Sequence, residues 1–183
     1  MINTKLRILL VEDEKTDAEL ITFQLKKIVE NFEIKVVDNI EDATHALHNY
    51  IPDVVLSDYN LPTCTGLDVL TTTQDIDANI PLIFITGTIN DEELAANTIL
   101  AGASGYILKK HMNILSEKLE PLLKRVIFEM IEKEDLREKV RKNKIAVNQI
   151  YSYLDDIKYD NEEQRKSIFE IRKKINKIDL NND

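Results

Sequence analysis

Short apolar runs alternate with helix-like segments through the first two-thirds of the chain. The apolar runs are Leu6–Val11, Ile34–Val37, Val54–Ser57, Leu82–Thr86 and Tyr106–Leu108. Nearly continuous runs of this length are typical of strands that helices cover on both faces of a parallel sheet. Apolar residues recur every three or four positions near 16–30, 40–49, 66–76 and 91–101, and from about 113 onward. We therefore predict an α/β fold, a doubly wound five-stranded parallel sheet with helices on both faces.

Polar residues follow the predicted strands in an informative pattern. Glu12 and Asp13 follow the first strand, Asp58 the third, Thr86 ends the fourth, and Lys109 follows the fifth. Ligands of doubly wound sheets bind outside the carboxyl ends of the strands, where the strand order reverses. Polar residues after buried strands are common because loops face water. Here, acids follow two strands, and a hydroxyl and an ammonium are found at the ends of two others. This combination is much less common than single polar loop residues, and it predicts a site.

Clustered carboxylates repel one another unless a cation lies among them. Oxygen ligands in this number suit Mg²⁺, with Mn²⁺ as a substitute. Asp58 can then act as a carboxylate nucleophile toward phosphorus and form an acyl phosphate. Lys109 can offset charge on the phosphoryl oxygens, and the Thr86 hydroxyl can donate to an oxygen that exists only in the modified state.

These motifs resemble the response-regulator receiver domain, the CheY-like partner of sensor histidine kinases. The resemblance extends from about Leu6 to Arg125, and its motifs are Val-Glu-Asp-Glu at 11–14, Ser-Asp-Tyr-Asn-Leu-Pro at 57–62, Gly66, Thr-Gly-Thr at 86–88 and Ala-Gly-Ala-Ser-Gly-Tyr-Ile-Leu-Lys at 101–109. It implies a flavodoxin-like (βα)5 fold and a phosphorylated regulatory protein, with no enzymatic activity beyond its own phosphorylation and dephosphorylation. The implied partner is a sensor histidine kinase or phosphotransfer protein.

The resemblance also implies a role for each site residue. Asp58 is the expected phospho-acceptor and a metal ligand, together with Glu12, Asp13 and the backbone carbonyl of Asn60. Thr86 and Tyr106 are the expected pair that rearranges on phosphorylation. Lys109, rather than Lys110, is the expected phosphate-contacting lysine, because strand alternation from Tyr106 favours it.

Two positions depart from the family pattern. Lys110 stands where the family usually has a proline, often after a cis peptide bond. A cis bond before a residue other than proline costs about 2.5–4 kcal/mol, so we expect a trans bond and a differently shaped loop. Gly87 replaces the usual alanine, which predicts a looser backbone after Thr86.

The chain beyond residue 125 has a purely helical pattern, and we predict a receiver domain at 1–125 and a helical coiled-coil extension at 126–183. Its heptad seam comprises Leu136, Val140, Asn143, Val147, Ile150, Leu154, Ile157, Asn161, Gln164, Ile168, Ile171, Ile175 and Ile178. A long helix is favoured because the heptad phase is unbroken, whereas the capping signal at Asp160 allows a helical hairpin. An exposed seam of this length predicts a homo-oligomer or a helical partner.

Charge and composition narrow the functional class. Of the net charge of −9, residues 1–128 contribute 11 Lys and Arg against 20 Asp and Glu, and residues 129–183 contribute 13 of each sign. An acidic domain repels phosphate backbones, so direct nucleic-acid binding is not expected. No apolar run is long enough to cross a bilayer, and the single cysteine, Cys64, predicts a reducing, cytoplasmic location without contact to a membrane.

The sequence therefore predicts a two-component response regulator that switches association through its helical extension. An alternative is the receiver fragment of a larger hybrid kinase or effector. A third interpretation is a phosphohydrolase with an aspartyl nucleophile. The haloacid-dehalogenase type of phosphohydrolase needs a second Asp at the position of Asn60, and this departure disfavours it. A pseudo-receiver that never becomes phosphorylated is disfavoured by the full set of site residues.

Overall fold

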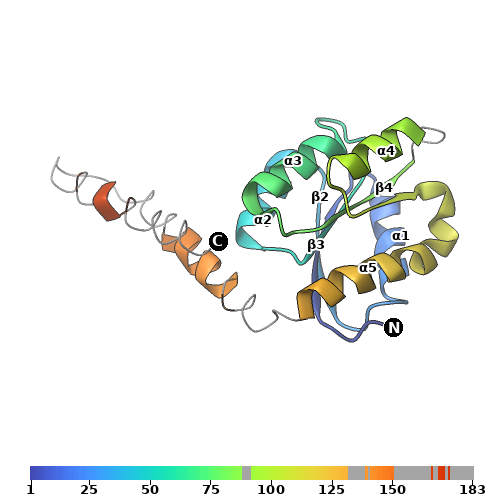
Figure 1. The fold of residues 1–183 in the computed structure, drawn as a ribbon, viewed down its shortest axis with the longest axis horizontal. Coiled ribbons are helices and arrows are strands. Elements are labelled where there is room, and N and C mark those ends of the chain that lie inside the picture. The colour runs from blue at the N-terminus through green and yellow to red at the C-terminus, as the bar shows by residue number, and fades with distance from the viewer. Residues whose placement is uncertain are drawn as a thin grey trace. The chain divides into compact units, whose positions relative to one another are not determined.

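The computed structural model describes residues 1–87, 92–131, 139, 141–150, 166, 169–171 and 173. The chain forms two compact units, Met1–Glu134 and Asp135–Asp183. Figure 1 shows the first unit as a central sheet with helices on both sides. Among the described residues, no helix is both long and apolar enough to span a bilayer.

The sheet has five parallel strands in the order β2-β1-β3-β4-β5. The strands are β1 (Leu6–Val11), β2 (Phe32–Val37), β3 (Val54–Ser57), β4 (Leu82–Thr86) and β5 (Gly105–Leu108). The order reverses between β1 and β3, whose register places Val11 beside Ser57. The carboxyl ends of these two strands therefore lie at the same height, and the residues that follow them are neighbours.

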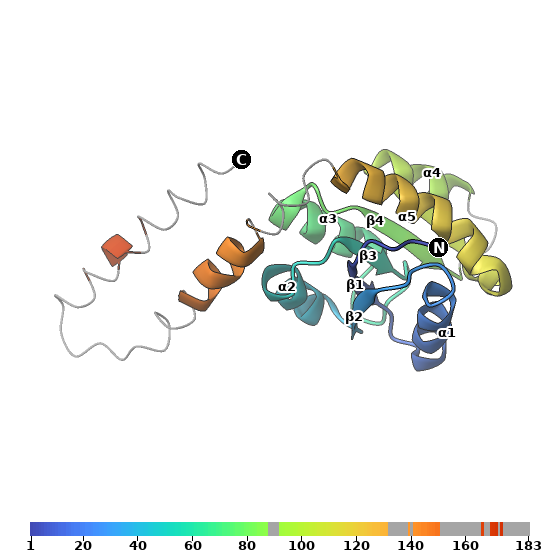
Figure 2. The same cartoon turned by 90° about the horizontal axis from the view of Figure 1, so that it is seen from below.

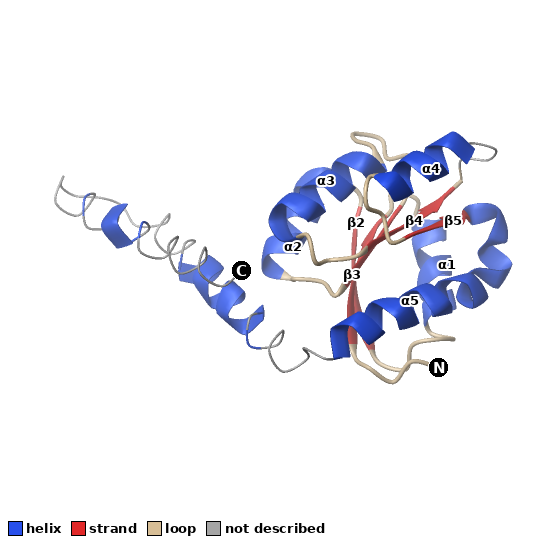
Figure 3. Cartoon of the chain, viewed as in Figure 1, coloured by secondary structure: helices blue, strands red, loops and turns tan. Residues whose placement is uncertain are grey.

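Helices cover both faces of the sheet, as Figures 2 and 3 show. They are α1 (Lys15–Leu25), α2 (Ile40–Asn49), α3 (Gly66–Asp77), α4 (Glu92–Leu100) and α5 (Leu115–Ile131), with a 3₁₀ helix, η1 (Lys109–Ile114), before α5. One apolar core joins α1 and α5 to one face of the sheet, and a second joins α2 and α3 to the other. The predicted doubly wound α/β fold is thus confirmed.

Helix ends follow local sequence signals in several places. Asn39 caps α2 by accepting from the Asp42 N–H at 2.8 Å, and Thr65 and Asp68 form a reciprocal capping box at the start of α3. Gly102 has φ +103°, the left-handed conformation that glycine favours after the end of a helix, here α4.

Helix α1 is shorter than its predicted range of 16–30. It ends at Leu25, and the following segment turns back to pair with the N-terminus. Ile28 and Val29 remain buried, and the Ile2 N–H donates to the Ile28 carbonyl at 2.6 Å. Apolar spacing predicted the burial correctly but could not show that a bridge to Ile2 replaces the helix.

The predicted division after residue 125 falls inside α5. Val126 and Ile127 are buried in the first unit, so the helix continues to Ile131 as part of that unit. In the second unit, residues 141–150 are helical. Most of the predicted heptad seam, and the choice between a long helix and a hairpin, lie outside the described residues.

Candidate functional site

Three acids converge at the carboxyl edge of the sheet. Glu12 and Asp13 directly follow β1, and Asp58 directly follows β3, with the Asp58 N–H donating to the Val11 carbonyl at 2.9 Å. Each acid offers an oxygen ligand, and these oxygens all lie within 4.8 Å of one another. Glu12 and Asp58 are buried. Parallel pairing of β1 and β3 brings together acids that are 45 residues apart in the chain.

Lys109 brings its ammonium to Glu12 and Asp58 and to a further acid, Asp17. Its Nζ lies 2.7 Å from Asp58 Oδ2, 2.9 Å from Glu12 Oε2 and 2.7 Å from Asp17 Oδ2. An ammonium has three N–H groups, so one contact to each carboxylate uses its donors fully. Lys110, the next residue, is exposed, so the ammonium beside these acids is that of Lys109.

The two oxygens of Asp58 have different surroundings. Oδ1 accepts from the backbone N–H groups of Tyr59 at 2.6 Å and Asn60 at 3.2 Å. Oδ2 faces the Lys109 ammonium. The loop amides thus hold the carboxylate in a fixed orientation and direct Oδ2 toward the cation.

Burial sets the electrostatics of the site. It raises the pKa of Glu12 above the ordinary value of 4.5, an effect that Lys109 opposes and the Asp58 charge reinforces. Burial alone would lower the pKa of Lys109, but hydrogen bonds to Asp17, Asp58 and Glu12 raise it well above its ordinary value. Lys109 therefore stays cationic at every physiological pH.

The donor set fits a hard divalent cation. All the clustered ligand atoms are carboxylate oxygens, which Mg²⁺ and Mn²⁺ prefer over nitrogen or sulfur. Three carboxylates surround a single ammonium, so the edge retains excess negative charge that a second cation would balance.

The predicted switch residues lie on the strands beside the acids. Thr86, the last residue of β4, is fully buried and pairs in register with Leu108. Tyr106 of β5 is half-buried and packs against the core formed with α2 and α3. Both residues are at the carboxyl half of the sheet.

Close packing shapes the loop after Asp58. A Cβ on Gly66 would lie 2.5 Å from Phe84 Cε1, 2.8 Å from Tyr59 Cα and 2.9 Å from the Asp58 carbonyl oxygen. Only a glycine lets α3 begin this close to the loop. By contrast, a Cβ on Gly87 would meet only Lys109 Cδ, at 3.9 Å.

Sequence reasoning missed Asp17. It lies in the first turn of α1, where acids are common for reasons of helix stability alone. Its four-residue separation from Asp13 places it one helical turn beyond the acidic motif, a weak signal that it could face the same edge.

The loop after β5 also differs from the family pattern. No cis peptide bond occurs in the described part of the chain, so the bond between Lys109 and Lys110 is trans, as expected. The segment from Lys109 to Ile114 forms η1.

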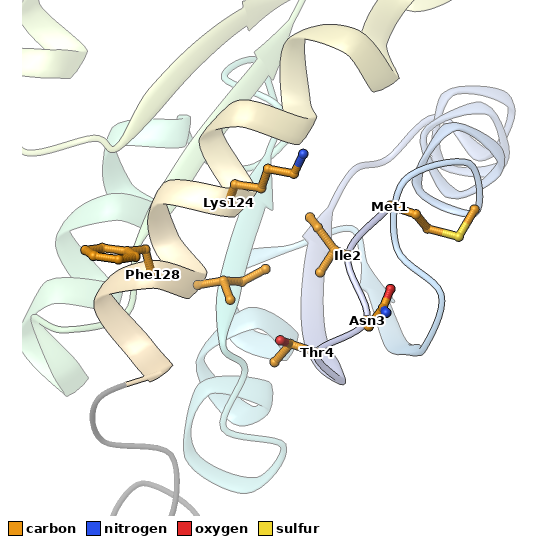
Figure 4. A pocket seen from close by; sticks show the side chains of 7 residues that line it. Met1, Ile2, Asn3, Thr4, Lys124 and Phe128 are labelled. Atoms are coloured by element: carbon orange, nitrogen blue, oxygen red, sulfur yellow. The ribbon is translucent and has the colours of Figure 1, made fainter.

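A separate pocket of about 240 Å³ lies at the opposite edge of the sheet (Figure 4). Its lining residues are Met1, Ile2, Asn3, Thr4, Lys124, Ile127 and Phe128. None of the predicted site residues lines this pocket.

Comparisons with known proteins agree with the fold. The cell cycle transcriptional regulator CtrA of Caulobacter vibrioides is 29% identical over 121 residues, which cover 66% of this chain and 51% of CtrA. The chain spans about half the length of the curated relatives it matches first.

Two solved structures are also similar. A CheY-like response regulator receiver domain protein from Methanospirillum hungatei shares the fold, with a TM-score of 0.58, 23% identity, and coverage of 70% of this chain and 99% of that one. The Mn²⁺-bound form of response regulator Rcp1 has a TM-score of 0.54 at 26% identity and covers 64% of this chain and 91% of its own. A family model described as the response regulator receiver domain matches residues 8–120. With its parallel sheet and acidic edge, the chain therefore belongs to the response regulator receiver domains, the CheY-like regulatory modules of two-component systems.

Proposed function

We propose that this protein is a response regulator that accepts a phosphoryl group on Asp58 from a sensor histidine kinase. One observation carries the proposal: the Asp58 carboxylate lies within a cluster with Glu12 and Asp13, and its Oδ2 is 2.7 Å from the Lys109 ammonium. Oδ2 forms the new bond to phosphorus while the phosphorus–nitrogen bond of the donor phosphohistidine breaks. The histidine nitrogen leaves with the electron pair, and the product is an acyl phosphate.

Glu12, Asp13, Asp58 and the backbone carbonyl of Asn60 are the residues that would hold Mg²⁺, or Mn²⁺ in its place. When bound, the divalent cation supplies charge neutralisation for the incoming phosphoryl oxygens. The chain's own groups do the rest. The Tyr59 and Asn60 amides orient the carboxylate, and Lys109 offers its ammonium to a phosphoryl oxygen in place of Asp58 Oδ2.

Phosphorylation then changes the neighbouring strands. A new phosphoryl oxygen accepts from the Thr86 hydroxyl, and Tyr106 on the adjacent strand repacks with it. The surface of α4, β5 and α5 passes this change to the helical region beyond residue 125. The output is a change of self-association or of binding to a helical partner, because described apolar residues of that region, Ile150 and Ile171, are exposed.

A second candidate function follows from the length of the curated relatives. CtrA is a transcriptional regulator, and this chain matches about half of its length. A receiver fragment of a larger hybrid kinase or effector is therefore the second candidate. The acidic charge of residues 1–128 argues that the receiver unit itself does not contact nucleic acid.

The test is phosphorylation of the purified chain by acetyl phosphate, read by intact mass and by hydroxylamine lability of the product. We expect one labile phosphoryl group that requires Mg²⁺ and is absent from Asp58→Asn. Stable unphosphorylated wild-type protein, or an equal mass gain in Asp58→Asn, would contradict the proposal. The proposed output is tested separately by sedimentation of the full chain with and without beryllofluoride, and identical assemblies in both states would argue against it.

A further inference from the structure

The η1 segment carries Lys109, and its half-buried Met112 packs against the edge of the core. None of the six residues from Lys109 to Ile114 is buried, and His111 departs from helical geometry with φ −103° and ψ 22°. Such a segment has few contacts that could fix its conformation. The carboxylates hold the ammonium at the tip of the Lys109 side chain, so a contact from outside η1 is needed to fix the backbone that carries it.

Gln24 of α1 makes that contact. Its Nε2 donates to the Met112 carbonyl at 2.8 Å, across 88 residues of sequence. The same carbonyl accepts from the Leu115 N–H, which closes η1 at the first residue of α5. Gln24 therefore binds the joint between η1 and α5, and Leu115 anchors that joint in the core.

The stability of the core does not account for a glutamine at this position. Gln24 is only 3% exposed, and its Oε1 has no donor among the described residues. A buried acceptor without a donor is unfavourable, so an apolar side chain of equal length would suit the core at least as well. The amide orientation is set, because only the NH₂ group can face a carbonyl oxygen.

Asp17 adds a second contact between the same two elements. It lies seven residues before Gln24, which is about two helical turns and places both on one face of α1. Asp17 holds the side chain of Lys109 at 2.7 Å, and Gln24 holds the backbone three residues further on. Two attachments fix the orientation of a segment, whereas one would leave it free to pivot.

We propose that Gln24 is a positioning residue that holds the η1–α5 joint from α1 and thereby sets the Lys109 ammonium against the reacting oxygen of Asp58. Gln24 touches neither the phosphoryl donor nor the acids and acts through the backbone of η1. The proposal rests on the proposed phosphorylation of Asp58. Its prediction for the motion of η1 is independent of that reaction.

The test compares Gln24→Met with Gln74→Met in the full chain. Gln74 is a matched control, because its Nε2 also donates to a backbone carbonyl, that of Ala101 at 3.0 Å, away from η1. We expect the initial rate of phosphorylation by acetyl phosphate at saturating Mg²⁺ to fall about three- to tenfold in Gln24→Met, the effect of losing one net hydrogen bond. Mg²⁺ affinity by calorimetry should stay within about twofold of wild type, because the carboxylates are untouched. Gln74→Met should match wild type in both.

Hydrogen exchange supplies a readout that does not depend on phosphorylation. Amides of residues 109–115 should exchange about three- to tenfold faster in Gln24→Met while those of β1 and β3 keep the wild-type rate. Unchanged exchange at 109–115, or an unchanged phosphorylation rate, would overturn the proposal. Should methionine prevent folding, Gln24→Leu takes its place with the same expectations. A wild-type chain that is never phosphorylated would refute the function of Asp58 and leave the exchange result to decide the role of Gln24.

Discussion

The two edges of the sheet both pair basic side chains with acids, yet their charge balance differs. At the carboxyl edge, Lys109 contacts Glu12, Asp17 and Asp58, so three carboxylates share one ammonium. The Lys109 side chain is 14% exposed and that of Glu12 is fully buried, so water screens these charges weakly. The carboxyl edge therefore holds uncompensated negative charge where little water can screen it.

At the amino edge, the bases Lys5 and Arg7 balance the acids Glu33 and Asp53, and Lys5 Nζ lies 2.6 Å from Glu33 Oε1. Arg7 lies over the Tyr50 ring, 4.4 Å from its centroid, and 3.9 Å from the half-exposed Glu33 carboxylate. The buried Asp53 carboxylate accepts from the Arg7 backbone N–H at 2.8 Å. Both edges place acids beside bases, so this arrangement alone is not enough for the proposed reactivity toward phosphorus. The carboxyl edge is distinguished by its excess of buried carboxylate over cation.

The most direct test of this difference removes one carboxylate from each edge. Asp58→Asn should reduce phosphorylation by acetyl phosphate to background, because the amide is no nucleophile toward phosphorus. Asp53→Asn removes the same charge and should keep the wild-type rate, while its free energy of unfolding falls by about 1 kcal/mol through the weaker hydrogen bond. Mass spectrometry and urea unfolding measure both. Loss of phosphorylation in Asp53→Asn would show that the two edges are not separate in function.

Removing the base from each edge should have the next largest effect. Lys109→Met leaves buried carboxylates unpaired and should cost about 3 kcal/mol of unfolding free energy in EDTA. Mg²⁺ at 100 times its Kd stabilises any variant that binds it by about 2.7 kcal/mol. It should stabilise Lys109→Met more than it stabilises wild type, because the divalent cation then replaces the missing positive charge among the carboxylates. Arg7→Met loses a half-buried ion pair and a ring contact and should cost about 1 kcal/mol relative to wild type with or without Mg²⁺. Equal Mg²⁺ responses in the two variants, measured by urea unfolding, would contradict the proposed charge difference.

A third pair of variants tests how tightly the carboxyl edge is packed. Gly66→Ala places a methyl group against Phe84 and the backbone of Tyr59 and should destabilise by about 2 kcal/mol. Gly87→Ala has its nearest neighbour, Lys109 Cδ, at 3.9 Å and should stay within about 0.5 kcal/mol of wild type. Thermal unfolding of both proteins checks the difference. Similar melting temperatures would mean that the loop after Asp58 yields to added volume.

The smallest effect concerns an acid of the same edge that no cation holds. Hydrogen bonds from the Thr65 backbone and side chain lower the pKa of Asp68 below the ordinary value of 3.8. A lowered carboxyl pKa means that this contribution to stability is present above the ordinary value and is lost as the pH falls through the folded-state pKa. The stability difference between wild type and Asp68→Asn should therefore shrink as the pH is lowered. Urea unfolding across the acid range measures it, with Asp75→Asn as the control for net charge. A difference that stayed constant with pH would exclude the capping box as its source.

Much of the fold and site follows from the sequence because both depend on strand ends. The run Leu6–Val11 and the run Val54–Ser57 are strands at those same bounds. Once they pair in parallel, their following residues must meet at one edge, and Asp13 and Asp58 do so. The charge pattern needed no tertiary information beyond the strand order.

Other features were decided by packing between elements distant in the chain. The contact of Asp17 with Lys109 and that of Gln24 with Met112 depend on how α1 lies against the start of α5, which no local pattern encodes. The early end of α1 depends in the same way on pairing of Val29 with Ile2.

The sequence by itself determined which groups follow the strands at the carboxyl edge, since alternation of strand and helix fixes where each strand ends, but it did not reveal that Asp17 of α1 joins them. Only the tertiary structure decided how the single ammonium of Lys109 is shared among three carboxylates and which backbone carbonyl holds its segment. The physical reason is the separation along the chain over which each kind of signal acts. Hydrophobic periodicity is a local property of a few neighbouring residues, whereas a hydrogen bond or ion pair between distant elements requires side-chain atoms to meet within about 3 Å.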